Sequence, residues 1–168
     1  MEFVDHVFLP LYEIVHDVSI DMVEAIPEED IDVRPYDTAR TFREQIVHMA
    51  TVEKAFALGA AGQGWGFETN GHNPDEYEGH TSLWNLLLQN RDEVVSLARA
   101  ITDDKLFVPI ETAWGFKATP AQLLVLARDH TNNHNGKLAI YLRLAGAEPP
   151  FYLALREETL ETLFSDWQ

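Results

Sequence analysis

The chain contains 168 residues, enough for one domain with a buried core. Hydrophobic residues make up 46% and charged residues 24% of the chain, a globular composition that excludes a disordered or fibrous protein. The 28 acidic and 12 basic residues give a formal net charge of -16, which argues against binding to nucleic acid or to an anionic membrane. Without cysteine there are no disulfides and no thiolate ligands, so any metal site must use His, Asp or Glu. We expect a single domain over residues 1–168.

Two further features concern location. The sequence has no run of 18 apolar residues, so we expect no transmembrane helix. Its first residues, MEFVDH, lack the basic and apolar regions of a secretory signal. These features predict a cytoplasmic protein.

The first half of the chain predicts two long helices. The first covers residues 2–26, ends before Pro27, and would turn inward an apolar stripe of Phe3, Val7, Leu11, Ile14, Val18 and Met22. The second covers residues 40–59, where Thr41 and Glu44 have the spacing of a capping box. Five glycines between positions 59 and 71 predict a loop that Trp65 and Phe67 attach to the body of the protein.

The second half predicts two more long helices. One begins at Thr81 or Ser82 and ends near residue 101, and short extended segments are expected at 106–108 and 113–116. The other begins at Thr119-Pro120 and ends before Gly146, and a short final helix is expected over 153–165. The predicted fold is all-α, an antiparallel four-helix bundle with a long crossover between its second and third helices.

One histidine pair has the spacing of metal ligands. His130 and His134 are four residues apart, which places them on one face of the last long helix. They lie in the middle of its apolar stripe and therefore face the interior of the bundle. The pair fits two interpretations: ligands of a metal ion, or core histidines that are hydrogen-bonded to neighbouring helices.

A third histidine favours the metal interpretation. His48 lies on the flank of the apolar stripe of the second predicted helix. Three neutral imidazoles suit a divalent ion such as Zn or Ni, with Mn or Fe as alternatives, and leave a position for water or substrate. His16 should face solvent. His6, His72 and His80 are predicted surface residues, with closure of one of the last two over the site as a minority alternative.

The residues around the histidines narrow the chemistry. Thr131 stands where a zincin would have its glutamate, and the paired Glu-x-x-His motifs of di-iron proteins do not occur. Side chains near enough in sequence to orient the imidazoles are Gln45, Glu53, Asp129 and Asn133, each of which could equally have a surface or capping role. Trp65, Trp84 and Trp114 could line a cleft, although such aromatic residues more often cover the core.

Several motifs together point to a family. They are RTFREQIVHM at 40–49, TPAQLL at 119–124, DHTNNHNGKL at 129–138, YLRLAG at 141–146 and the prolines at 149 and 150. In these motifs and their order the chain resembles the DinB/YfiT-like metalloprotein superfamily. The resemblance implies a four-helix bundle, often a homodimer, that holds a divalent metal through His48, His130 and His134. Characterised relatives include bacillithiol S-transferases and mycothiol-dependent isomerases, so it also implies a low-molecular-weight thiol and a small-molecule substrate.

The chain departs from the family pattern after its last histidine. Many members carry Arg and Gln there, whereas this chain has Asn135 and Lys137. Lys137 could hold a carboxylate of the thiol or substrate, or extend into solvent. The first functional hypothesis is a metal-dependent enzyme, either a thiol S-transferase or a thiol-dependent isomerase. The alternatives are a non-catalytic, metal-binding, stress-associated dimeric module, and a bundle whose histidines bind no metal.

Overall fold

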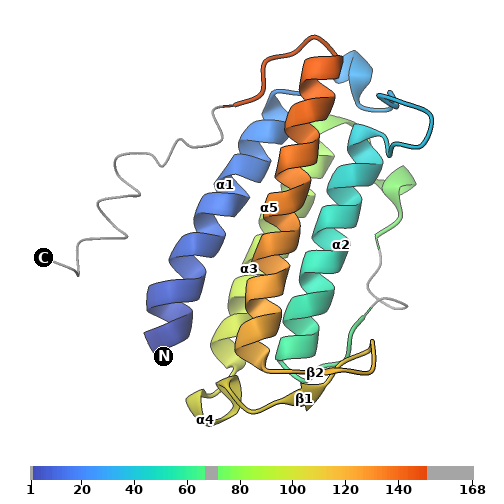
Figure 1. Ribbon diagram of the computed structural model, residues 1–168. Coiled ribbons are helices and arrows are strands. Elements are labelled where there is room, and N and C mark those ends of the chain that lie inside the picture. Colours follow the sequence, from blue (N-terminus) through green and yellow to red (C-terminus); the bar gives the residue numbers. More distant parts are fainter. Residues whose placement is uncertain (1, 67–71, 151–168) are drawn as a thin grey trace, which may run out of the picture.

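The computed structural model describes residues 2–66 and 72–150, and its described part contains four long helices (Figure 1). These are α1 (Leu9–Glu24), α2 (Phe42–Ala60), α3 (Gly79–Ala100) and α5 (Pro120–Leu144). A π-helical segment, η1 (Val4–Phe8), leads into α1. The connections contain η2 (Glu28–Asp30), η3 (Pro74–Glu76) and the short helix α4 (Asp103–Leu106). Phe67 and the predicted helix over 153–165 lie outside the described residues.

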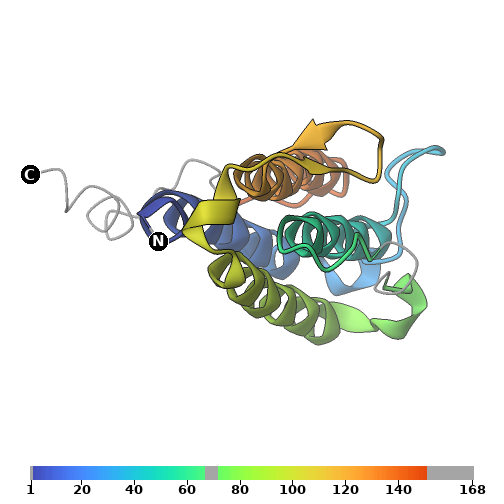
Figure 2. The same ribbon diagram turned by 90° about the horizontal axis from the view of Figure 1, so that it is seen from below.

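The four long helices form the predicted bundle. α1 and α5 run in one direction and α2 and α3 in the other (Figure 1). α2 and α1 each pack against both α5 and α3, which gives the four-cornered arrangement seen along the bundle axis in Figure 2. A crossover between residues 60 and 79 returns the chain along the bundle, so that α2 and α3 are parallel neighbours. The all-α fold with its long crossover is therefore confirmed.

Capping residues define two helix starts as predicted. The hydroxyl of Thr41 accepts the backbone N–H of Glu44, whose carboxylate accepts the backbone N–H of Thr41. Thr119 and Gln122 form the same reciprocal pair at the start of α5. Gly146, just beyond α5, has a φ of 79°, a left-handed conformation that favours glycine. These local signals are independent of tertiary packing, which explains why the sequence located them.

The start of α3 differs from the prediction. The helix begins at Gly79, before Thr81 and Ser82. The hydroxyl of Ser82 donates to the carbonyls of Glu78 and Gly79 instead of accepting a backbone N–H. Ser82 therefore bonds within the first turn and does not cap it.

The connection between α3 and α5 also differs. The predicted extended segments at 106–108 and 113–116 are wrong, because α4 buries Leu106 and a hairpin follows it. Its strands, β1 (Ile110–Glu111) and β2 (Lys117–Ala118), pair antiparallel, with Ile110 opposite Ala118. The hydroxyl of Thr112 donates to the carbonyl of Phe116 and closes the turn between them. A two-stranded sheet thus joins the otherwise helical fold.

The first helix faces the core with a different side than predicted. Val7 and Leu11 of the predicted stripe are 47% and 38% exposed, whereas His16 is only 1% exposed. The prediction that His16 faces solvent is wrong for two reasons. The π-helical turn at η1 breaks the regular 100° spacing, and the true inward face carries polar His16 and Ser19, which a hydropathy count assigns to solvent.

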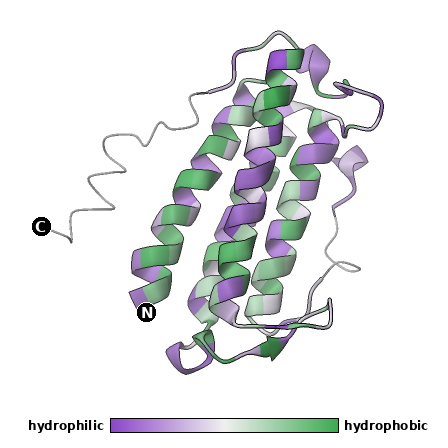
Figure 3. Ribbon diagram, viewed as in Figure 1, coloured by the Kyte–Doolittle hydropathy of each residue, from purple (hydrophilic) through white to green (hydrophobic). Residues whose placement is uncertain are grey.

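The core consists of two apolar clusters with polar side chains between them. One cluster includes Met22, Phe42, Ile46, Leu83 and Leu138, and the other includes Phe8, Ala57, Val94, Leu123 and Leu124. Figure 3 shows the corresponding hydrophilic stretch halfway along α5. None of the described helices is apolar over a length that could cross a membrane. The buried members of this polar layer are His16, Ser19, Gln45, Glu53, Asn90, Thr131, His134 and Asn135.

Candidate metal site

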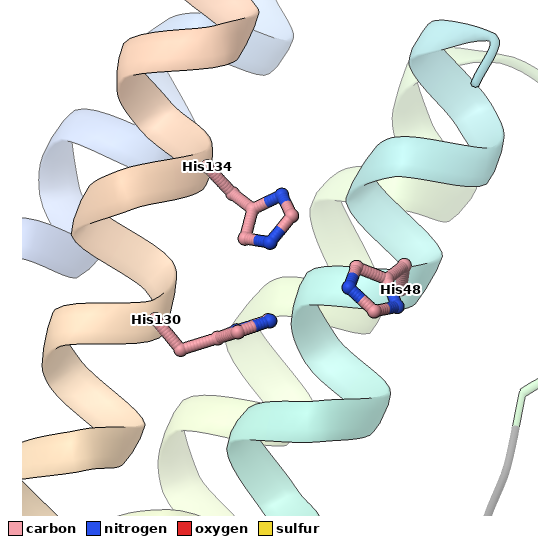
Figure 4. A group of neighbouring side chains, drawn as sticks. All are labelled: His48, His130 and His134. Carbon is pink, nitrogen blue, oxygen red and sulfur yellow. The ribbon is translucent and has the colours of Figure 1, made fainter. Parts of the chain in front are cut away.

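Three histidines converge at the edge of the polar layer. His48 comes from α2 and His130 and His134 from α5, and the three rings face one another (Figure 4). One ligating nitrogen from each residue lies within 4.8 Å of the other two. The ring centroids of His130 and His134 are 4.3 Å apart, and that of His48 is 5.1 and 4.9 Å from them. The fold thus brings together the three residues predicted from the sequence.

All three imidazoles are neutral at pH 7. Burial is the main cause, and it lowers the pKa of His48 and His130 to about 4 and that of His134 to about 3. The positive charges of Arg40 and Lys137 lower these pKa values further. A neutral imidazole offers the lone pair that a metal ion requires, so the cluster is in its binding-competent form.

The donor set fits a divalent cation. Zn–N bonds of about 2.0–2.1 Å place ligating nitrogens roughly 3.3 Å apart in a tetrahedral site, so small side-chain movements would bring these nitrogens into position. Nδ1 of His130 is buried and has no hydrogen-bond partner among the residues that the structure describes. An unpaired buried nitrogen costs free energy that a bound cation would recover. The cluster therefore has the residue types, protonation and spacing of a three-histidine metal site.

Gln45 contacts the cluster from α2. Its side-chain amide meets Nδ1 of His134, and the glutamine is only 1% exposed. The structure places the amide nitrogen of Gln45, its Nε2, at this contact. With the amide turned by 180°, its oxygen would accept the Nδ1 proton and leave Nε2 of His134 free for a metal. Of the predicted orienting residues, this is the one that touches a histidine of the cluster.

Glu53 is buried close by but serves a different network. Its two carboxylate oxygens accept hydrogen bonds from Asn90, at 2.5 Å, and Thr131, at 2.8 Å. Burial raises its pKa to about 7, although both hydrogen bonds oppose that shift. Glu53 therefore connects α2, α3 and α5 within the polar layer. The sequence left open whether it orients an imidazole or has a surface or capping role, and the described residues show neither.

Other predicted partners lie apart from the cluster. Asp129 and Asn133 are exposed on α5, and Asp129 pairs with its neighbour Arg128. Asn135 is fully buried, and its Oδ1 accepts a hydrogen bond from Ser19 at 2.9 Å. Asn135, which stands where many family members carry Arg, therefore links α5 to α1.

The remaining histidines also lie outside the cluster. His72 pairs with the hydroxyl of Tyr77 at 2.7 Å, and His80 pairs with Glu28 at 2.7 Å. Neither belongs to the three-histidine group found among the described residues. The alternative that His72 or His80 closes over the site is therefore not supported.

Three aromatic residues form a wall beside His130. The ring of Phe56 lies 6.4 Å from His130 and 5.4 Å from Trp114, which in turn lies 4.8 Å from Trp65. We call Phe56, Trp65 and Trp114 the aromatic wall. The sequence indicates both tryptophans as candidate cleft residues but not Phe56. Phe56 joins the aromatic wall only because the β1–β2 hairpin brings Trp114 against α2, which the sequence does not show.

Comparison with known proteins agrees with this architecture. The family model described as the DinB family matches residues 7–163. The uncharacterized protein YjoA of Bacillus subtilis strain 168 is 29% identical over 139 residues, which cover 80% of this chain and 87% of YjoA. The crystal structure of a DinB-like protein, YjoA of Bacillus subtilis, superposes with a TM-score of 0.67 and 25% identity, covering 90% of this chain and 98% of that one. The helical bundle, the motif order and the family match together show that the chain belongs to the DinB family.

Proposed function

We propose that this protein binds a divalent metal ion through His48, His130 and His134 and catalyses a thiol-dependent reaction of a small molecule. The observation that carries the proposal is the convergence of three imidazoles from two helices within 4.8 Å. Their lowered pKa values support it, because they keep the rings unprotonated at neutral pH. The thiol is inferred from the resemblance to DinB/YfiT-like enzymes.

The chemistry follows from the nature of such a site. A bound divalent cation lowers the pKa of a coordinated thiol and so supplies a thiolate at neutral pH. In an S-transfer, the sulfur forms a bond to an electrophilic carbon, the bond from that carbon to the leaving group breaks, and the leaving group departs with the electron pair while the thiol proton passes to solvent. In an isomerisation, the thiol adds to the substrate and is eliminated again after a bond rotation.

The chain's own side chains have distinct parts in this scheme. The three histidines hold the cation, and Gln45 orients the ring of His134. The aromatic wall next to His130 offers an apolar surface for the carbon skeleton of the electrophile. No protein nucleophile is required.

Elemental analysis of the untagged protein, purified without chelator, tests the metal site. We expect about one Zn or Ni per chain in the native protein and its loss in the double variant His48→Ala, His130→Ala. The matched control is His72→Ala, His80→Ala, which removes two histidines outside the cluster and should keep the metal. A native protein that retains no metal and gains none from added Zn, Ni or Mn would contradict the proposal.

Activity distinguishes the enzyme from the alternative. The metal-loaded protein is mixed with a panel of low-molecular-weight thiols and electrophiles, and loss of free thiol is followed over time. We expect turnover that the double histidine variant lacks. Stoichiometric metal without turnover would favour the non-catalytic module. The homodimer implied by the resemblance stays a prediction.

A further inference from the structure

A pocket of about 400 Å³ opens beside the histidine cluster. Gln45 belongs to both, because it lines the pocket and also contacts His134. We call this cavity the basic pocket; the lining residues that matter here are Arg34, Tyr36, Arg40, Gln45, Lys137 and Tyr141.

The charge of the basic pocket opposes that of the whole chain. The chain has a net charge of -16, yet three cationic side chains and no carboxylate are among the described residues that line the pocket. Arg34 is already neutralised, since it pairs with Glu44 at 2.6 Å. Arg40 and Lys137 form no ion pair with any residue in the described ranges 2–66 and 72–150. Two cations therefore remain available to an anion.

These two cations lie close to the histidines. Lys137 follows His134 by three residues on α5, a rise of about 5 Å along the helix. Both Lys137 and Arg40 act electrostatically on all three histidines of the cluster. An anionic group held here would therefore lie beside the histidine cluster.

Two tyrosines add polar groups to the same pocket. Tyr141 is 5% exposed, and its ring meets that of Tyr36 edge-on at 6.1 Å. A phenol hydroxyl can donate a hydrogen bond to an anionic oxygen, and such charge-assisted hydrogen bonds are stronger than neutral ones. The pocket thus combines two cationic side chains that form no ion pair among the described residues with two phenol groups that can donate hydrogen bonds.

We propose that the basic pocket binds a carboxylate or phosphate group of the substrate or cosubstrate through Arg40 and Lys137, so that the molecules acted on are small anions. The position of the reactive atom rests on the proposed function, because that atom must reach the histidine cluster. The anion site itself does not depend on a metal. The two parts can therefore be tested separately.

The first experiment uses the metal-free full chain. Acetate and inorganic phosphate are titrated into ¹⁵N-labelled protein, and backbone amide shifts are followed by NMR. We expect saturable shifts around residues 34–45 and 137–141, weakened about five- to tenfold in Lys137→Met and abolished in the double variant Arg40→Gln, Lys137→Met. Lys105→Met, an equal charge change on α4, should bind like the native chain. The anion that binds more tightly identifies the preferred group.

The second experiment uses the cobalt-loaded chain. Binding of 3-mercaptopropionate and of the uncharged 3-mercaptopropan-1-ol is measured through the sulfur-to-cobalt absorption band. We expect the carboxylate thiol to bind about five- to tenfold more tightly, with this preference retained in Lys137→Arg and Lys105→Met and lost in Lys137→Met.

The results separate the two proposals. Failure to bind cobalt, or the absence of a thiol band with either probe, would overturn the proposed function and leave the NMR titration to decide the anion site. Equal affinity for the two thiols would overturn the inference while supporting the metal site. Linear, non-saturable NMR shifts, or shifts unchanged in the double variant, would likewise overturn the anion site.

Discussion

The side-chain amide of Gln45 on α2 meets Nδ1 of His134 on α5, although the two residues are 89 positions apart. Both are buried in the polar layer, so water cannot easily replace either partner. A partner on the far nitrogen of a histidine fixes the tautomer and the direction of the ring. This contact links helix packing directly to the geometry of the proposed metal site.

Loss of Gln45 should weaken metal binding without unfolding the bundle. We expect Gln45→Ala to lower zinc affinity by about 10- to 100-fold, since His134 loses the group that orients it. Competition with a chromophoric chelator measures the change, and Gln89→Ala, an exposed glutamine on α3, is the control. Equal affinity in Gln45→Ala and the native chain would show that Gln45 does not orient the ring.

The buried Glu53 should make stability fall as pH rises. Its pKa is about 7 in the folded chain against an ordinary value of 4.5, so the folded state binds the proton more tightly than the unfolded state. Stability from this group is present below pH 4.5 and is lost as pH rises to about 7, a change of about 3 kcal/mol. Glu53→Gln removes the titrating group, and Oδ1 of Asn90, unpaired among the described residues, can accept its amide.

Urea unfolding at several pH values checks this expectation. Relative to the native chain, Glu53→Gln should gain stability between pH 4.5 and pH 8, and Glu24→Gln, an exposed glutamate, should show no such gain. A difference between Glu53→Gln and the native chain that does not vary with pH would mean that Glu53 titrates normally.

His16 should have the opposite pH dependence. Burial, aided by the charge of Arg91, lowers its pKa from 6.5 to about 4, although the backbone of Leu87 favours the protonated ring. The unfolded chain therefore binds the proton more readily, and stability is lost as pH falls from 6.5 toward 4. We expect His16→Leu to be more stable than the native chain, with an advantage that grows by about 2 kcal/mol between pH 8 and pH 5.

The same unfolding experiment tests His16, with His6→Leu as a control on the exposed side of the first helical segment. Neither ring nitrogen of His16 forms a hydrogen bond of normal geometry with a described residue, so leucine removes an unpaired polar group as well as a titrating one. A loss of stability in His16→Leu at both pH values would reveal a polar partner for this ring.

Gly59 should be intolerant of a side chain. A Cβ at this position would lie 2.8 Å from the ring of Trp65, and the tryptophan belongs to the aromatic wall. We expect Gly59→Ala to destabilise the protein by about 1–3 kcal/mol and to shift the tryptophan emission, because the indole must move. Gly136→Ala, within α5 and with open space around the added carbon, should instead stabilise it by up to about 1 kcal/mol. Similar effects of the two substitutions would contradict the contact.

The predictions that succeeded depend on neighbours in sequence. Thr41 with Glu44 and Thr119 with Gln122 define helix starts through hydrogen bonds three residues apart, and the structure contains both. His130 and His134 share a face because they are four residues apart on one helix. Inferring the position of His48 required only the inward face of α2, which its apolar residues mark.

The predictions that failed depend on groups brought from elsewhere. The sequence predicts that His16 faces solvent because it lies opposite the predicted apolar stripe of the first helix, whereas the structure buries it. The hairpin β1–β2 lies apart from the expected extended segments, since its turn is closed by Thr112 and Phe116 rather than by a run of β-forming residues. The sequence does not mark Arg40 as a binding residue. Arg40 and Lys137 line one pocket only because α2 packs on α5.

The sequence by itself determined the four-helix bundle, most of its helix ends and the three histidines, because periodicity and capping act within a few residues. The tertiary structure alone decided the rotation of α1, the burial of His16 and Glu53, the contact of Gln45 with His134 and the basic pocket. The contacts behind these features join residues that lie about 40 to nearly 120 positions apart in the sequence. Their energies come from burial and from the pairing of polar groups between helices, which a one-dimensional pattern does not contain.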